Sequence, residues 1–276
     1  MDFRLKMGLF LAGWCALSSV TYACDLANCT YERTLPSGWT TIQSVKTASF
    51  QRGSFTGSYV AWTPQMRWQA AQGWALGAFV TALSMTSTAQ SAQGLGNVVL
   101  FAEMPLWLSD TLMVGTQIQL PSAQTNTGLS SGHIEIMPYT QWGSPMGFGF
   151  VFAKGGARFV LGDTGTTGHG IFEIASHGPH LRPANNDVHE VEVFPHTDRE
   201  FVGQVGWGWQ LDLLTVTPYV SGYYSLVTAS EQGLSAGSRV DWALSPQWRV
   251  SVTGEWPVTT ARRENNNIGV WITTLL

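Results

Sequence analysis

From about residue 40 to the C-terminus, apolar and polar side chains alternate along this chain with a period of two. Successive side chains of a β-strand point to opposite faces, so the alternation predicts strands that meet two different environments. The segment 59–69 shows the pattern most clearly. One face carries Val60, Trp62, Pro64, Met66 and Trp68, and the other carries Tyr59, Ala61, Thr63, Gln65, Arg67 and Gln69.

The pattern predicts about twelve strands, joined by connections that alternate in length. Bacterial outer-membrane barrels have an even number of strands, short periplasmic turns and longer outer loops. In hydrocarbon each unpaired edge group costs several kcal/mol, so such a sheet must close on itself. We therefore predict an all-β fold, a closed antiparallel transmembrane barrel over residues 39–276. The predicted strands are 40–51, 56–69, 73–85, 96–108, 111–120, 132–142, 146–160, 200–211, 214–226, 233–244, 247–258 and 267–276.

The predicted connections follow the same rhythm. Twelve strands would place both ends of the barrel chain on the short-turn side, which is the periplasmic side. Short turns are expected at 70–72, 109–110, 143–145, 212–213 and 245–246, and longer loops at 86–95, 121–131, 161–199, 227–232 and 259–266.

The N-terminus has the features of a secretory signal peptide. Arg4 and Lys6 precede an apolar run that ends near Leu17, and small residues lead to Ala23. The run is shorter than the about 20 apolar residues that a membrane-spanning helix needs. We expect residues 1–23 to be removed as a signal peptide and the mature protein to reach the bacterial outer membrane.

Residues 24–38 are expected to form a short periplasmic segment before the barrel. Cys24 and Cys29 lie close together in this segment, in what would be an oxidising compartment. A small disulfide loop between them is the first interpretation. A lipid anchor on Cys24 is the alternative, although the residues before Cys24 fit a lipoprotein cleavage site poorly.

The composition supports a membrane barrel over a soluble one. Charged residues make up 12% of the chain, against about 25% in an average soluble domain. A soluble β-sandwich or lipocalin-like barrel, which is the alternative, should show charge on its outer face. The net charge of −4 gives no reason to expect nucleic acid as a partner. An aromatic girdle near the short turns is expected from Trp68, Trp74, Trp107, Trp142 and Trp248.

Residues 94–160 contain short Gly-rich motifs in a recognisable order. Gly-Leu-Gly-Asn at 94–97 is followed by Gln-Leu-Pro-Ser at 119–122, by Gly-Leu-Ser-Ser-Gly-His at 128–133 and by Met-Pro-Tyr at 137–139. This order resembles the outer-membrane barrels named after the meta-pathway of phenol degradation. The resemblance implies a barrel that takes up small, often hydrophobic molecules, and it implies no catalytic residues.

One set of charged and aromatic side chains is expected to point into the barrel. A pore with such walls selects among solutes. A filled interior, in which opposite charges pair, is the alternative, because twelve strands lie between filled barrels of about eight strands and wide channels of about 16–18. Arg239, Asp241, Arg249 and Glu255 lie on two adjacent strands and are expected to form a cross-strand ladder. The expected lumen-lining residues are Arg67, Glu103, Glu135, Tyr139, Arg239, Asp241, Arg249 and Glu255.

Five of the six histidines lie in the long loop expected at 161–199. Neutral imidazole is a common ligand of Zn and Cu, and nearby carboxylates can complete a site. The alternative, which we favour, is a solvated His-rich loop without a metal. The candidate metal ligands are His169, His177, His180, His189 and His196.

We expect no enzyme. A barrel that hydrolyses lipids needs a Ser–His pair oriented by a third polar group near the membrane rim. Ser176 and His177 are neighbours in the sequence, and such neighbours rarely face each other productively. His133 is the only histidine expected on a strand, and its parity places it inside the barrel.

The sequence favours passive passage of small solutes, including hydrophobic or aromatic ones, across the outer membrane. The alternative is a non-conducting barrel whose loop 161–199 binds a metal ion or a surface partner. The expected partners are outer-membrane lipid, lipopolysaccharide and a small-molecule solute. Arg262 and Arg263, in an expected outer loop, are the candidate contacts for lipopolysaccharide phosphate, and a solvated pair of arginines is the alternative.

Overall fold

The computed structural model describes residues 37–52, 55–87, 91–106, 112–121, 134–161, 199–226, 232–259 and 266–276. Within these ranges no helix is long and apolar enough to cross a membrane. The described residues form twelve β-strands. They are β1 (Gly38–Arg52), β2 (Phe55–Gln69), β3 (Ala75–Ser87), β4 (Ser91–Pro105), β5 (Leu112–Leu120), β6 (Ile134–Met146), β7 (Gly149–Leu161), β8 (Arg199–Leu211), β9 (Leu214–Ser225), β10 (Gln232–Ala243), β11 (Trp248–Pro257) and β12 (Asn266–Leu275).

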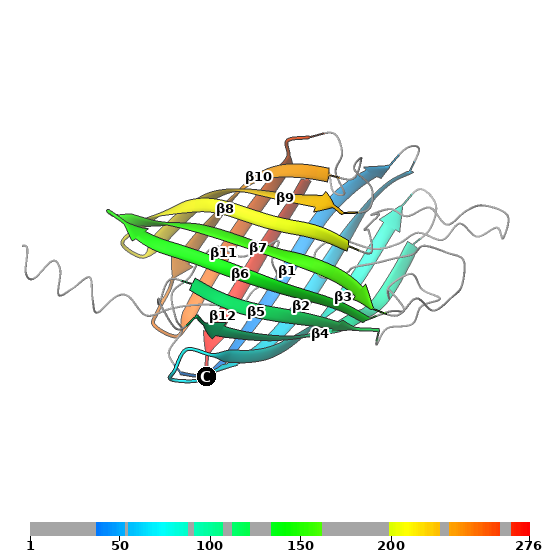
Figure 1. The fold of residues 1–276 in the computed structure, drawn as a ribbon. Coiled ribbons are helices and arrows are strands. Elements are labelled where there is room, and N and C mark those ends of the chain that lie inside the picture. Colours follow the sequence, from blue (N-terminus) through cyan, green and yellow to red (C-terminus); the bar gives the residue numbers. More distant parts are fainter. Residues whose placement is uncertain are drawn as a thin grey trace, which may run out of the picture.

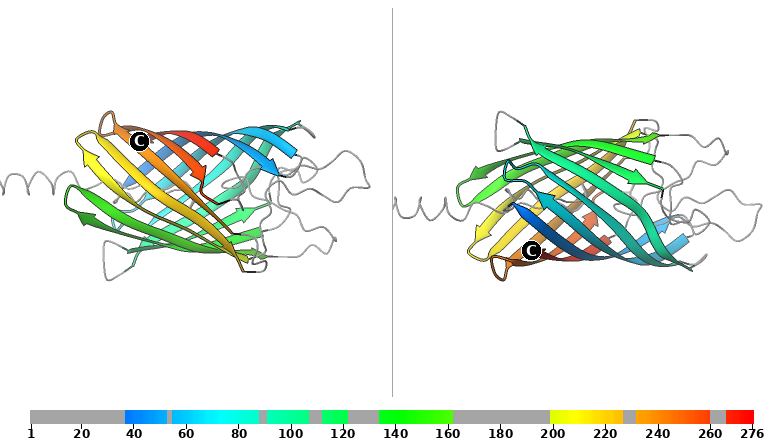
Figure 2. Two further views of the ribbon diagram at one scale, coloured as in Figure 1. Left: turned by 90° about the horizontal axis from the view of Figure 1, so that it is seen from above. Right: turned by 90° about the horizontal axis from the view of Figure 1, so that it is seen from below.

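The strands form one closed barrel, in which each strand pairs antiparallel with its neighbours in the sequence and β12 pairs with β1 (Figure 1). The closing seam runs from Thr40 opposite Leu275 to Ser49 opposite Asn266. Both views in Figure 2 show strands inclined to the barrel axis, as closure of a sheet requires. The predicted closed antiparallel barrel is therefore confirmed.

The turn between β6 and β7 differs from the prediction. A turn was expected at 143–145, but Ser144 and Pro145 lie within β6 and remain paired with β7. The chain reverses instead at Gly147 and the residue after it, where Gly147 has a φ of 59°. Two-residue hairpin turns require positive φ, which glycine adopts at little cost. The predicted turn is wrong: Gly-Ser-Pro at 143–145 has residues typical of turns, but β6 continues through these residues in its pairing with β7.

The start of β4 also differs from the prediction. The strand was expected from residue 96 and begins at Ser91. A β-bulge interrupts its pairing with β3 between Leu95 and Val98. An extra residue in a strand reverses the faces of the side chains that follow. Leu95 is accordingly 62% exposed while Val99 is 3% exposed, so the alternation before the bulge is out of phase with the alternation after it.

The two faces of the barrel wall differ in polarity, as the alternation predicts. On β10 and β11, outward Val240 and Val252 are 39% and 45% exposed, while the inward neighbours Arg239 and Ser251 are 4% and 0% exposed. A soluble barrel would place these apolar side chains inside and the polar ones outside. The observed arrangement suits a barrel surrounded by lipid, whose closed ladder satisfies the backbone groups internally.

Tryptophan side chains gather toward the short-turn end of the barrel. Trp68 and Trp74 flank the β2–β3 turn, and their ring centroids lie 4.9 Å apart in an edge-to-face arrangement. Trp142 and Trp248 are 43% and 49% exposed on the outward face. An indole has an apolar body and a polar N–H, which suits the boundary between lipid and water. Trp107 of the predicted girdle lies outside the described residues.

We expect Val252→Arg to lower the free energy of unfolding by about 2–4 kcal/mol, because it places a cation at the middle of the lipid-facing wall. Val252 lies near the middle of β11, and its ladder partners are Val240 and Val270. Thr274→Arg, at the short-turn end of β12, is the matched control and should cost about 0–1 kcal/mol. Urea unfolding of the protein refolded in lipid vesicles measures both costs. Equal costs at the two positions would contradict a hydrocarbon layer around the barrel.

Candidate functional site on the inner wall

The candidate site is the inner wall of the barrel. The structure places all eight side chains expected to point inward on this wall. Arg249 and Glu255 are half-buried there. The other six are at most 8% exposed, namely Arg67, Glu103, Glu135, Tyr139, Arg239 and Asp241.

A chain of polar contacts crosses the wall from β2 to β6. Arg67 Nη2 lies 3.2 Å from a carboxylate oxygen of Glu103, and Tyr139 Oη donates a hydrogen bond of 2.5 Å to the other oxygen. Arg67 Nη2 also donates to Gln69 Oε1 at 3.2 Å. Burying a charge is costly unless it is paired and hydrogen-bonded. The contacts supply that pairing, so Glu103 and Arg67 form a neutral pair on the wall.

Glycines on the intervening strands let the long side chains lie against the wall. Gly115 on β5 is the ladder partner of both Glu103 and Tyr139. A Cβ atom added to Gly115 would lie 2.5 Å from the Tyr139 ring, so the ring covers the glycine. Aromatic rings that cover glycines in this way stay at the wall. The same contact joins Phe101 to Gly77, Tyr219 to Gly237, Phe152 to Gly206 and Phe150 to Gly208.

A second Tyr–Gly–Glu arrangement lies on β9, β10 and β11. Gly237 is the ladder partner of both Tyr219 and Glu255. Glu255 accepts a hydrogen bond of 2.6 Å from Ser221 Oγ and one of 3.4 Å from Tyr219 Oη. This carboxylate is therefore held by hydroxyl groups of β9, across the intervening strand.

Arg239 and Asp241 form an ion pair along β10, with 2.6 Å between Nη2 and Oδ1. Ser251 on β11 donates a hydrogen bond of 2.5 Å to Asp241 Oδ1 and accepts one of 3.0 Å from Arg239 Nη2. The predicted ladder of Arg239, Asp241, Arg249 and Glu255 is wrong for Glu255, which β9 binds instead. Alternation gives the face of each side chain, while the stagger between strands decides its partners.

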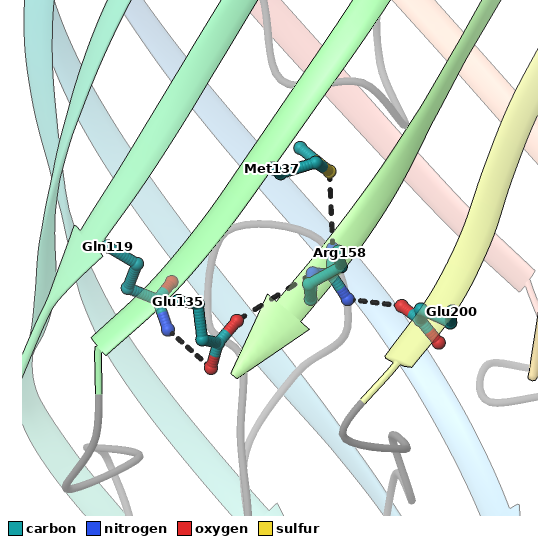
Figure 3. Close-up of polar contacts among 5 residues, drawn as sticks. All are labelled: Gln119, Glu135, Met137, Arg158 and Glu200. Carbon is teal, nitrogen blue, oxygen red and sulfur yellow. Dashed lines mark hydrogen bonds and ion pairs between the residues drawn. The ribbon is translucent and has the colours of Figure 1, made fainter. Parts of the chain in front are cut away.

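A third polar cluster joins β5, β6, β7 and β8 (Figure 3). Arg158 lies between two carboxylates: its Nη1 contacts Glu200, and its Nε is 3.7 Å from Glu135. Gln119 Nε2 donates a hydrogen bond of 3.0 Å to Glu135, and Arg158 Nη2 is 3.9 Å from the sulfur of Met137. Arg158 and Glu200 are ladder partners near the end of β7 and the start of β8. The cluster therefore ties together four strands, β5 to β8, at the long-connection end of the barrel.

Sequence reasoning missed four inward ionisable side chains: Lys46, Lys154, Arg158 and Glu200. Lys154 and Arg158 share the inward parity of β7, but Gly155 and Gly156 lie between them, and glycines inside a strand are typical of a bulge or kink. The β7 ladders run through that point without a register shift. If the alternation had been continued through the two glycines, it would have predicted that Lys154 and Arg158 point inward. Glu200 is the second residue of its strand, where alternation is too short to assign a face.

Several predicted features lie outside the described residues. Among the residues that are described, no group of three or more His, Cys, Asp or Glu side chains could hold a metal ion. The features left outside are the signal peptide 1–23, most of the segment 24–38 with Cys24 and Cys29, the loop residues His169, Ser176, His177, His180, His189 and His196, and also His133, Arg262 and Arg263.

A closed twelve-stranded antiparallel barrel with an apolar outer face and a polar inner wall defines a class, the bacterial outer-membrane β-barrels. Within that class the fold is similar to the COG4313 outer membrane channel from Pseudomonas putida F1. The TM-score is 0.64 at 11% sequence identity, with 93% of this chain and 100% of that chain covered.

Two further solved structures have similar folds. The KdgM porin gives a TM-score of 0.51 at 6% identity and covers 86% of this chain and 99% of its own. The β domain of the Bordetella autotransporter BrkA gives 0.50 at 13% identity, with 86% and 98% covered. The sequence matches no protein-family model and no curated protein. At these identities the similarity concerns the fold, and the resemblance to the phenol-degradation family stays a prediction.

Proposed function

We propose that this protein is a passive channel of the bacterial outer membrane, through which small solutes diffuse down their gradients. The observation that carries the proposal is the construction of the inner wall. Four of its described carboxylates contact arginines, and aromatic rings rest on glycines of neighbouring strands. In a channel the side chains are held at the wall, whereas in a filled barrel they meet across the interior. The contacts along the wall support the first arrangement.

The fold supports this proposal. The structures from Pseudomonas putida and of KdgM, which it resembles, are named an outer membrane channel and a porin. The proposed passage requires no reacting group on the wall, and no cofactor. It requires lipid around the barrel, which the outward valines and leucines accommodate.

The proposed solutes are small, and they include aromatic or other apolar molecules. Inward rings such as Phe101, Phe152 and Tyr219 lie on the inner wall beside hydrogen-bonding groups. Ligand sites for small organic molecules combine these two features, with polar groups that fix orientation and apolar groups that supply contact area. An inner wall of this kind suits a solute with an apolar ring or chain and few charges.

Planar-bilayer recording of the refolded full-length protein tests the proposal. We expect discrete conductance steps, because the proposed channel would let ions pass through the barrel one protein at a time. Liposome swelling with neutral sugars and with small aromatic alcohols measures the passage of solutes. Protein that has been heat-unfolded in the same detergent is the control. Refolded, heat-modifiable barrel that gives neither conductance nor swelling would contradict the proposal and favour a filled interior.

A further inference from the structure

We propose that Glu255 is the residue of the inner wall that favours cations over anions in the proposed channel. This inference rests on the proposed function, since selectivity requires conduction. The observation behind the inference is the set of contacts that the inward carboxylates make. Within the described part of the chain, four of them contact an arginine, and the fifth contacts hydroxyl groups.

The paired carboxylates come first. Glu103 contacts Arg67, and Asp241 contacts Arg239. Glu135 and Glu200 share Arg158. Opposite charges within ion-pair distance form a dipole, whose field falls off faster with distance than that of a single charge. The pairs of Glu103 and Asp241 are neutral, and the Arg158 cluster keeps one net negative charge because two carboxylates share one arginine. All of these groups are 0–8% exposed, so a passing ion meets them covered.

Glu255 differs in both respects. Among the inward carboxylates of the described ranges, it is the one for which no ion pair with an arginine or lysine of those same ranges is found. Its two partners are the hydroxyl groups of Ser221 and Tyr219. Hydroxyl donors stabilise the ionised form of a carboxylate but leave its net charge in place. Glu255 is also half-buried, and therefore more accessible than the other four.

The position of Glu255 suits an effect on ions that enter the barrel. It lies two residues before the end of β11 at Pro257, on the side of the long connections. Tyr219 covers Gly237, which is the ladder partner of Glu255, and this contact holds the hydroxyl group beside the carboxylate. A fixed charge in a low-dielectric passage raises the local concentration of ions of opposite sign. The carboxylate would therefore enrich cations at this mouth.

The test is the reversal potential of the full-length protein in a KCl gradient. Glu255→Gln removes the charge and keeps one acceptor oxygen, with an amide NH2 in place of the other oxygen. It should lower the K⁺/Cl⁻ permeability ratio about two- to fivefold. Glu255→Asp keeps the charge and should retain most of the ratio. Asp212→Asn is the matched control, because it removes one negative charge from the exposed turn between β8 and β9. That control should leave the ratio unchanged.

The outcomes separate this inference from the proposed function. A conducting Glu255→Gln protein with an unchanged ratio would overturn the inference and leave the channel standing. A loss of selectivity in Glu255→Asp equal to that in Glu255→Gln would also overturn it, because the residue would then act through its length. If the Gln variant does not refold, Glu255→Ala provides the neutral comparison. A parent protein without conductance would overturn the proposed function, and the inference with it.

Discussion

Arg158→Met should lower the free energy of unfolding of the barrel by about 3–5 kcal/mol, the usual cost of removing one partner from a buried ion pair. The substitution keeps much of the volume of the side chain and removes its charge. Glu200 and Glu135, which Arg158 contacts, are 0% and 4% exposed. Both carboxylates would lose this cation while remaining shielded from water.

The position of this cluster makes the loss larger than that of an exposed pair. An exposed salt bridge contributes about 0–1 kcal/mol, because water solvates the remaining charge. Here the remaining carboxylates repel each other in a region of low dielectric. Urea unfolding in lipid vesicles, followed by tryptophan fluorescence, measures the change. A cost within about 1 kcal/mol of zero would show that water reaches the cluster freely.

The matched control neutralises the whole cluster. The triple variant Glu135→Gln, Arg158→Met and Glu200→Gln removes the carboxylate charges together with the cation. Replacing a complete buried ion cluster with neutral side chains is often neutral or stabilising. We therefore expect the triple variant to recover most of the stability that the single variant loses. A triple variant as unstable as Arg158→Met would assign the effect to packing against Met137.

The architecture could be predicted from the sequence because lipid imposes a simple rule on a barrel. Every second side chain must be apolar over the height of the hydrocarbon layer, and the edges of the sheet must pair. Val240 and Val252 follow this rule on β10 and β11, where both side chains are exposed on the outer face of the barrel. The rule fails locally where the chain departs from strict alternation. The bulge after Leu95 reverses the two faces, and for that reason the start of β4 was placed too late.

The polar contacts could not be predicted in the same way. Alternation shows that Glu103 and Tyr139 point inward, but their contact also requires Gly115 to lie between them on β5. That placement depends on the stagger of three strands, which the period of two leaves undetermined. The same limit separates Glu255 from its predicted ladder and joins it to Ser221, which lies 34 residues earlier in the chain. The face to which a side chain points follows from the local sequence pattern, while its contact partners depend on the register between strands.

Gly115→Val should destabilise the barrel and reduce its conductance. The new Cβ would lie 2.5–2.8 Å from atoms of the Tyr139 ring, so the ring must leave the wall. Overpacking of this kind costs about 1–3 kcal/mol. Moving the ring also breaks its hydrogen bond to Glu103, and a hydrogen bond to a charged group contributes about 1.5–3 kcal/mol. The displaced ring has only the barrel interior to occupy, so the conductance of each channel should fall.

Gly155→Ala is the matched control, because its added Cβ has no neighbour closer than Val202 O at 3.7 Å. Alanine should be tolerated there, and the smaller conformational freedom of the unfolded chain should offset any small contact cost. Unfolding in vesicles and single-channel recording of both variants form the test. Gly115→Val with normal stability and unchanged conductance would mean that Tyr139 can leave the wall without consequence, and the aromatic–glycine contacts would then not determine the free space inside the barrel.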